Sequence, residues 1–145
     1  MDNSYYRVMG LDYGDVRIGV AMSDLTRLIS SGLESYTRVN LAKDLEHFDK
    51  IIKENKVQVV VLGLPLNMDG TEGVRVEKTR FFADKLAEKS GVKIEYFDER
   101  LSSVNAEEIL ISAGVRRDKR KGVIDKLSAT LILQSYLDLK RGELK

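Results

Sequence analysis

Acidic side chains stand at the ends of two apolar segments of this sequence. Asp12 ends the first apolar segment of the chain, and Asp98 and Glu99 follow a later one. A carboxylate at the end of a buried strand costs free energy unless it has a partner or a chemical task. A further acid, Asp125, stands near the start of the last helix that the pattern predicts. These four residues are therefore the candidates for catalysis or metal binding.

Each candidate also has a purely structural explanation. Asp12 could serve a hairpin turn or pair with Arg17 across it. Asp98 and Glu99 could form an acidic cluster before a helix, where the helix dipole favours negative charge. Asp125, if it lies in the first turn of its helix, would gain about 0.3–1 kcal/mol from the same dipole.

The acids favour one kind of chemistry when they are taken together. The chain has no cysteine, and carboxylates that converge without cysteine or histidine suit hard cations, Mg²⁺ or Mn²⁺, rather than zinc. Two such ions about 3.5–4 Å apart can activate a water and stabilise the leaving oxygen of a phosphodiester. The set therefore indicates a metal-dependent nuclease.

The apolar pattern predicts the elements that position these acids. A hairpin with its turn at Gly14-Asp15 is followed by alternating helices and strands, which implies an α/β fold with a mixed central sheet and helices on both faces. Asn40 is a plausible cap for the first helix, and Gly91 a left-handed end for the second. Strands are expected at 6–12, 17–23, 33–37, 57–62 and 93–97, and helices after residue 40, at 74–90, from 103 to before 114, and at 123–141.

Small residues surround Asp12 and Asp125 in this scheme. A two-residue turn would place Gly19 opposite Gly10 and Ala21 opposite Val8, on the same sheet face as Asp12. Such a face suits a ligand or a closely packed helix. Asp125 shares its helix face with small residues, so its turn could approach the strand ends. Asp98 and Glu99 are adjacent, so only one of them can point to a given sheet face.

Length and composition limit the classes of protein to which this chain can belong. The 145 residues fit a single domain, residues 1–145, with a formal net charge of only +1. Any affinity for nucleic acid must then come from local patches. The first residues lack the basic and apolar regions of a signal peptide, and no apolar run approaches the roughly 18 residues of a membrane span. We expect a cytoplasmic protein that does not bind membranes.

Four segments in order resemble the YqgF/RuvX family across nearly the whole chain: residues 10–20, 61–73, 97–103 and 121–129. The family has an RNase H-like fold and is described as a Holliday junction resolvase and as a nuclease that matures the 5′ end of pre-16S ribosomal RNA. The resemblance implies that Asp12 is the first catalytic carboxylate and Asp125 the last. Glu99 is the preferred middle one, because related resolvases use a glutamate at the corresponding strand, and Asp98 stays an alternative metal ligand.

The resemblance implies Mg²⁺ or Mn²⁺ as cofactor, with two ions expected, and pre-16S ribosomal RNA as the first expected substrate. A branched-DNA resolvase and a non-catalytic nucleic-acid-binding module are the alternatives. An ATPase of the actin-like or sugar-kinase type is disfavoured, because such enzymes need two domains around the nucleotide. We expect a monomer or a homodimer, since a two-fold junction would favour a symmetric dimer.

Basic residues near the acids could hold the phosphate backbone. Arg100 and Lys126 flank the expected site and could hold the scissile phosphate, although solvated surface charge explains them equally well. A basic run in the expected loop before the last helix could grip the backbone. The loop from Asn67 to Gly73 is too long for a simple connection, and we expect it to contact substrate or a partner chain. The basic run consists of Arg116, Arg117, Lys119, Arg120 and Lys121.

Overall fold

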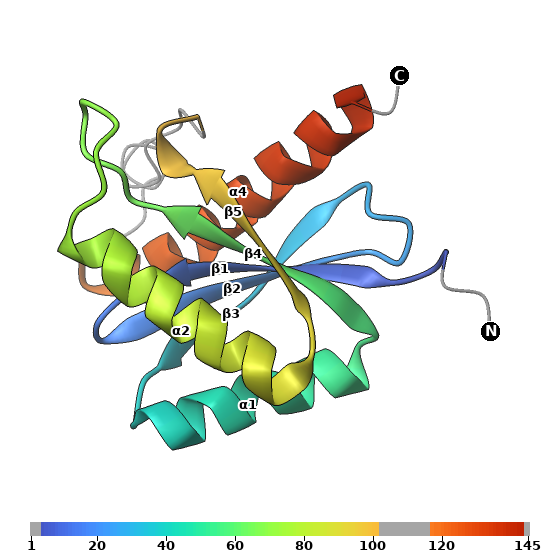
Figure 1. Cartoon of the computed structure of the whole chain (residues 1–145), viewed down its shortest axis with the longest axis horizontal. Coiled ribbons are helices and arrows are strands. Elements are labelled where there is room, and N and C mark those ends of the chain that lie inside the picture. The colour runs from blue at the N-terminus through green and yellow to red at the C-terminus, as the bar shows by residue number, and fades with distance from the viewer. Residues whose placement is uncertain (1–3, 102–116, 144–145) are drawn as a thin grey trace.

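The computed structural model describes residues 4–101 and 117–143, with the side chains of the last helix described from Val123 to Gly142. It is a five-stranded sheet with helices packed against it (Figure 1). The helix expected from Ser103 to before Gly114 lies outside the described residues. The elements are β1 (Arg7–Tyr13), β2 (Arg17–Ser23), β3 (Ser30–Thr37), α1 (Leu41–Glu54), β4 (Val57–Leu64), α2 (Val74–Ser90), β5 (Lys93–Asp98), the short 3₁₀ helix η1 (Glu99–Leu101) and α4 (Arg117–Glu143).

The sheet is mixed, as the sequence predicts. Its strand order is β3-β2-β1-β4-β5. Strand β2 is antiparallel to its neighbours β1 and β3, and β4 is parallel to its neighbours β1 and β5. Because β1, β4 and β5 run in the same direction, their carboxyl ends meet at one edge. Figure 1 shows the start of α2 and the first half of α4 at that same edge.

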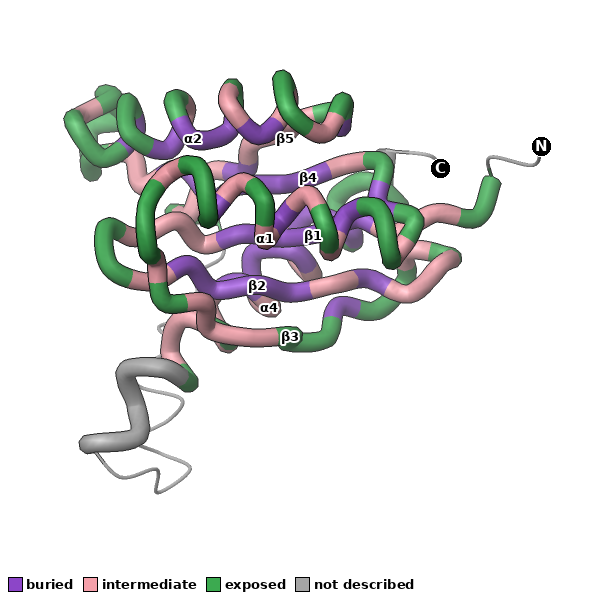
Figure 2. Tube along the Cα trace, turned by 90° about the horizontal axis from the view of Figure 1, so that it is seen from below, coloured by how far each residue is buried: buried purple, intermediate pink, exposed green. Residues whose placement is uncertain are grey.

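Helices cover both faces of the sheet. On one face α1 and α2 pack on a buried cluster that includes Leu11, Phe48 and Phe82. On the other face α4 packs on a cluster that includes Val8 and Leu133. Figure 2 shows the buried residues concentrated in the central strands and on the inner side of α2. The expected architecture with helices on both faces is therefore confirmed.

The predicted caps of α1 and α2 are present. The side chain of Asn40 accepts a hydrogen bond from the backbone N–H of Lys43 at 2.9 Å, which satisfies one free donor of the first turn. Gly91 ends α2 with a φ of 74°, in the left-handed region where a glycine carries no Cβ penalty. Residues Val74–Ser90 form the second helix with the predicted bounds.

The last helix begins earlier than the sequence pattern suggests. The prediction ended a charged loop at Lys121 and began the helix at Val123, but α4 begins at Arg117. Arginine and lysine are good helix formers, and one internal glycine, Gly122, costs only about 1 kcal/mol. Asp125 therefore lies more than two turns inside the helix, and the helix dipole does not explain it.

The register of the first hairpin also differs from the prediction. Gly19 lies opposite Asp12 and Ala21 opposite Gly10, a shift of two residues, because Tyr13 pairs with Ile18. The longer hairpin loop is tied to the segment after β3, where the N–H of residue 38 donates to the carbonyl of residue 16 at 2.9 Å. A shift by two residues keeps the same side chains on the same face.

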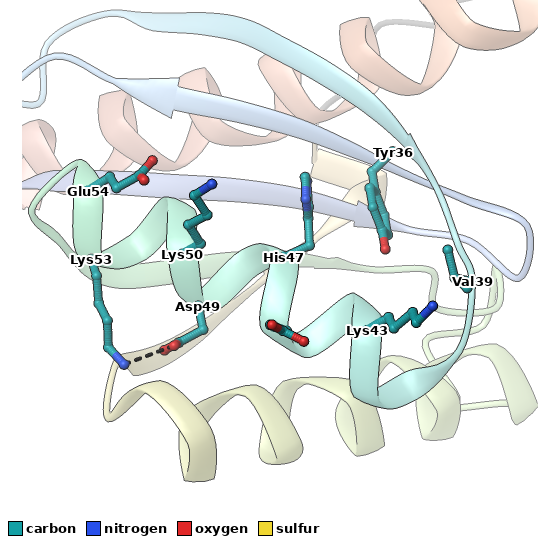
Figure 3. Close-up of a pocket in the computed structure, with 9 residues that line it drawn as sticks. Tyr36, Val39, Lys43, His47, Asp49, Lys50, Lys53 and Glu54 are labelled. Atoms are coloured by element: carbon teal, nitrogen blue, oxygen red, sulfur yellow. Dashed lines mark hydrogen bonds and ion pairs between the residues drawn. The ribbon is translucent and has the colours of Figure 1, made fainter.

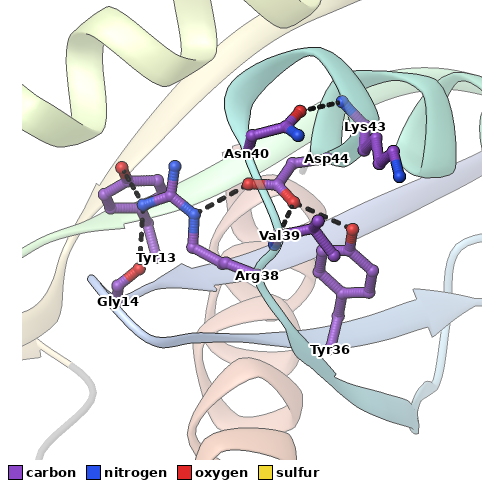
Figure 4. A network of polar contacts seen from close by, with 8 residues as sticks. All are labelled: Tyr13, Gly14, Tyr36, Arg38, Val39, Asn40, Lys43 and Asp44. Atoms are coloured by element: carbon purple, nitrogen blue, oxygen red, sulfur yellow. Dashed lines mark hydrogen bonds and ion pairs between the residues drawn. The ribbon is translucent and has the colours of Figure 1, made fainter.

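A buried acid anchors this hairpin loop to α1 (Figure 4). The carboxylate of Asp44 is fully buried and accepts hydrogen bonds from Tyr36 Oη at 2.8 Å, Arg38 Nε at 3.0 Å and the Val39 N–H at 2.9 Å. Burial alone would raise the pKa of Asp44, but these hydrogen bonds outweigh it and the pKa is lowered. Arg38 also donates to the hydroxyl of Tyr13 at 2.5 Å. The network thus holds the end of β1, next to Asp12, in place.

Candidate functional site

Two carboxyl groups meet at the carboxyl edge of the sheet. Asp12 lies near the end of β1, and Glu99 is the first residue after β5. The two side chains are hydrogen-bonded to each other across β4. Gly63 on β4 makes room for them, since a Cβ there would lie 2.7 Å from Glu99 Oε1. The fold thus brings together acids that are 87 positions apart in the sequence (99 − 12).

The two carboxyl groups of this pair do not readily ionise together. Burial, together with the nearby charges of Glu99 and Asp125, raises the pKa of Asp12 to about 8. Burial also raises the pKa of Glu99, although its hydrogen bond with Asp12 acts in the opposite direction. Two carboxyl groups that share a hydrogen bond in a half-buried position can bind a proton or a cation between them.

Asp98 is turned to a different partner. Its carboxylate receives the guanidinium of Arg100, with Nε–Oδ1 at 3.0 Å and Nη2–Oδ2 at 2.7 Å. This hydrogen-bonded ion pair lowers the pKa of Asp98. The two adjacent acids therefore have different partners, and Glu99 rather than Asp98 lies beside Asp12. Arg100, expected as a phosphate ligand, is engaged by Asp98 in this structure.

Asp125 lies close to the pair but is held by a basic partner. Its Oδ2 lies 2.7 Å from Arg17 Nε and 3.2 Å from the hydroxyl of Ser35. Its charge nevertheless contributes to the raised pKa of Asp12. The structural alternative in which Arg17 pairs with Asp12 is wrong, because Arg17 pairs with Asp125.

Glycine allows Asp125 to come this close to the sheet. A Cβ at Gly19 would lie 1.9 Å from the backbone oxygen of Asp125, and one at Gly10 would lie 2.8 Å from Leu133 Cβ. The backbone of α4 therefore rests directly on β1 and β2. The small face around Asp12 is filled by a closely packed helix, which is one of the two uses that the sequence suggested for it.

Arg75 is a charged neighbour of the pair that the sequence pattern did not single out. It lies in the first turn of α2, and its positive charge acts to lower the pKa of both Asp12 and Glu99. The available signal was its position, two residues after a long loop that follows a buried strand. The carboxylate pair thus has basic groups on both sides, with Arg17 near Asp125 and Arg75 on α2.

The other predicted basic residues lie elsewhere or are not described at the level of side chains. Lys126 lies over β3, where a Cβ at Gly32 would be 2.7 Å from Lys126 Cγ. That strand is two places from β1 in the sheet, so Lys126 does not flank Asp12. Arg116 lies outside the described residues. Arg117, Lys119, Arg120 and Lys121 belong to α4 rather than to a loop, and their side chains are not described.

A groove away from these acids offers no comparable chemistry. It has a volume of about 720 Å³ and runs along α1 beside Tyr36 and Val39 (Figure 3). Lysines and acids alternate along it, and Lys53 pairs with Asp49 at 2.8 Å. Mixed charges that neutralise one another give no convergent binding potential. The carboxylate pair at the sheet edge is therefore the better candidate site.

The donor set at the sheet edge fits a hard divalent cation. Asp12 and Glu99 supply carboxylate oxygens, and a cation would replace the proton that their hydrogen bond implies. Within residues 4–101 and 123–142, no three acidic or histidine side chains form one cluster that could hold a metal ion. The structure therefore shows a pair with a third acid nearby, instead of the converged set of three that the sequence predicted.

Comparison with known proteins assigns the chain to a family. Residues 6–139 match the family model described as RuvX, Holliday junction resolvase. The chain belongs to the RuvX family. A relative in Clostridioides difficile named "Putative pre-16S rRNA nuclease" is 50% identical over 134 residues, which cover 92% of this chain and 95% of the relative. A relative of the same name in Carboxydothermus hydrogenoformans is 52% identical over 134 residues, 92% of this chain and 97% of the relative.

Solved structures show that this RuvX chain has the RNase H-like fold of the RuvC-type nucleases. RuvC of T. thermophilus in complex with a Holliday junction aligns with a TM-score of 0.60 and 14% identity over 93% of this chain and 96% of that chain. The large terminase nuclease of phage G20c aligns with a TM-score of 0.55 and 14% identity over 93% and 83%. The predicted fold is thus confirmed. None of the described helices is long and apolar enough to cross a membrane.

Proposed function

We propose that this RuvX protein is a metal-dependent endonuclease in which Asp12 and Glu99 bind the cation. The observation that carries the proposal is the hydrogen-bonded pair of half-buried acids at the carboxyl edge of the sheet. Such a pair costs stability without a cation, and that cost is typical of a functional site. We assign Asp125 as the third carboxylate. Asp98 is not a ligand in this proposal, because Arg100 engages it.

A bound Mg²⁺ or Mn²⁺ ion, with a second one at the same carboxylates, would supply an activated water and stabilise the charge on the leaving oxygen. The chain itself positions the three carboxylates. Gly63 gives Glu99 space beside Asp12, and Gly19 lets the backbone of Asp125 approach the sheet. Arg17 Nε pairs with Asp125 Oδ2 at 2.7 Å. We assign the basic residues at the start of α4, Arg117 to Lys121, to the phosphate backbone of the substrate.

The proposed substrate is the 5′ leader of pre-16S ribosomal RNA, processed in the cytosol. The support is that relatives about half identical over nearly the whole chain carry that name. A second candidate is the four-way DNA junction. It is favoured by the description of the family model and by the fold shared with RuvC bound to such a junction. A non-catalytic binding module is disfavoured, because acids repel phosphate when no cation is bound.

One cleavage experiment tests the function and separates the two substrates. The full-length protein is incubated with Mn²⁺ or Mg²⁺ and either a labelled pre-16S leader transcript or a synthetic four-way junction. We expect cleavage of the leader at defined positions, and none in EDTA. Cleavage of the junction alone would transfer the protein to the resolvase function. Metal-dependent binding without cleavage of either substrate would overturn the nuclease proposal.

The ion pair of Arg17 with Asp125 provides a test of the third carboxylate. Arg17→Met removes the cation that competes with metal for Asp125, so Mn²⁺ should bind more tightly, by about three- to tenfold, equivalent to roughly 1 kcal/mol. Calorimetric titration with Mn²⁺ measures this directly. Lys78→Met is the matched control, because Lys78 pairs with Asp15 on the same edge and not with Asp125. Unchanged or weaker Mn²⁺ binding in Arg17→Met would remove Asp125 from the metal site.

A further inference from the structure

A groove opens directly beside Glu99. It has a volume of about 530 Å³ and is walled by the loop after β4, the first turn of α2 and the 3₁₀ helix η1. Met68 stands on the loop side, Arg75 on the α2 side, and Glu99 and Arg100 on the η1 side. The volume is within the range of about 300–1,000 Å³ that small ligands occupy in proteins. The groove is therefore large enough for one nucleotide next to the carboxylate pair.

Met68 is exposed on a loop that is internally fixed. Its relative exposure is 98%. The N–H of Asn67 donates to the carbonyl of Thr71 at 3.0 Å, and the Gly70 N–H donates to the Asn67 carbonyl at 2.8 Å. Asp69 Oδ1 accepts from the Thr71 N–H at 3.0 Å. The loop therefore holds the apolar side chain out in water by its own hydrogen bonds.

The exposure of Met68 is shared by its surroundings, so it differs from an isolated surface residue. Val74, on the α2 side of the groove, is 64% exposed, and Leu101, at the end of η1, is 66% exposed. Arg100 connects the walls, because its Nη1 donates to the Met68 carbonyl at 3.4 Å while its guanidinium pairs with Asp98. Exposed apolar side chains on two walls of one groove, Met68 and Val74, indicate a surface that a binding partner covers.

Arg75 gives the opposite wall a positive charge. The residue is exposed, and no hydrogen bond or ion pair holds its guanidinium among the residues that the structure describes. It lines both this groove and a small pocket of about 70 Å³ beside Tyr13 and Gly14. Its charge also reaches Asp12 and Glu99. A guanidinium in this position can bind a phosphate next to the acids.

We propose that the groove binds one unpaired nucleotide of the substrate next to the scissile bond, with its phosphate at Arg75 and its base against Met68. The proposal rests on the proposed nuclease function and specifies the form of its substrate. The base must be unpaired and unstacked, because a stacked base has no free face for the methionine. The thioether of methionine makes favourable contacts with aromatic rings. The expected contact of the Asn67 to Gly73 loop is thus assigned to substrate rather than to a partner chain.

Binding measurements on an inactive background test the groove without relying on cleavage. The full-length Asp12→Asn protein is titrated with two RNA hairpins of the same stem, one blunt and one with a single-stranded 5′ overhang. Met68→Ala should weaken binding of the overhang hairpin about five- to tenfold and leave the blunt hairpin unchanged. Met68→Leu should retain most of the affinity. Leu139→Ala, at an exposed apolar residue of α4, is the matched control and should have no effect.

The phosphate contact has its own signature. Arg75→Ala should weaken binding of the overhang hairpin and reduce the salt slope by about 0.7, the value for one phosphate that is no longer neutralised on a single strand. Arg75→Lys should restore part of the affinity and part of the salt slope. Arg141 is an exposed arginine in the last turn of α4, and Arg141→Ala should change neither quantity. Equal weakening of both hairpins, or no weakening by Met68→Ala, would overturn the proposal.

Failure of this proposal and failure of the nuclease function are distinguishable. Cleavage of the same hairpins by the parent protein is measured separately. If the parent cleaves and the Met68 and Arg75 variants bind both hairpins normally, the nuclease proposal stands and the groove proposal is wrong. If the variants show the predicted differences in binding but the parent never cleaves, the groove proposal stands and the nuclease proposal is wrong.

Discussion

Asp12→Asn and Glu99→Gln proteins will fold and will lose cleavage by about a thousandfold or more, as expected when several kcal/mol of metal-dependent stabilisation is removed. Both substitutions keep the shape of the side chain and remove one ionisable carboxyl group from the pair. Because the fold buries the two acids side by side, ionising both of them costs stability without metal. The melting temperature of each variant without metal should therefore equal or exceed that of the parent, and Mn²⁺ should no longer raise it.

Asp98→Asn is the matched control for this experiment. It changes the adjacent acid, but that acid contacts Arg100 at 2.7 Å and not Asp12. We expect it to retain most of the cleavage and the stabilisation by Mn²⁺. Melting curves with and without Mn²⁺, and cleavage of the leader transcript, are measured for all variants. Activity in Asp12→Asn would refute the mechanism, and inactivity of Asp98→Asn with activity in Glu99→Gln would move the ligand to Asp98.

Gly19→Ala should strongly destabilise the fold by the addition of a single methyl group. The added Cβ would lie 1.9 Å from the backbone oxygen of Asp125, so α4 must move as a body. Overpacking of a core costs about 1–3 kcal/mol, and a backbone clash is at the upper end, which lowers the melting temperature by roughly 10 °C in a chain of this size. Cleavage should fall as well, because Asp125 moves with its helix.

Gly142→Ala separates this effect from the general cost of replacing a glycine. Gly142 lies in the last turn of α4, and a Cβ there would meet nothing within 4 Å. Alanine is the better helix former, so its melting temperature should stay the same or rise slightly. Thermal melts and cleavage rates of the two variants give the comparison. A Gly19→Ala protein as stable and active as the parent would show that the close approach of α4 to β2 is not needed.

The sequence by itself determined most of the elements and pointed to the two acids that the fold brings together at the candidate site. Helix α2 has the predicted bounds because Gly91 marks its end by a local backbone preference. Asp12 and Glu99 were found because a charge at the end of an apolar strand is costly wherever that strand lies in the fold. The preference for Glu99 over Asp98 came from the resemblance to a known family, and strand alternation agrees with it.

Only the tertiary structure decided which side chains meet. Arg17 could pair with Asp12 or with Asp125, and the choice of Asp125 depends on where α4 crosses the sheet. The early start of α4 and the shifted hairpin register follow from contacts with distant segments, which a local pattern does not contain. Arg75 was missed for the same reason. Backbone preferences and hydrophobic periodicity act between near neighbours in the chain, whereas the charges that surround a site come together only when the chain has folded.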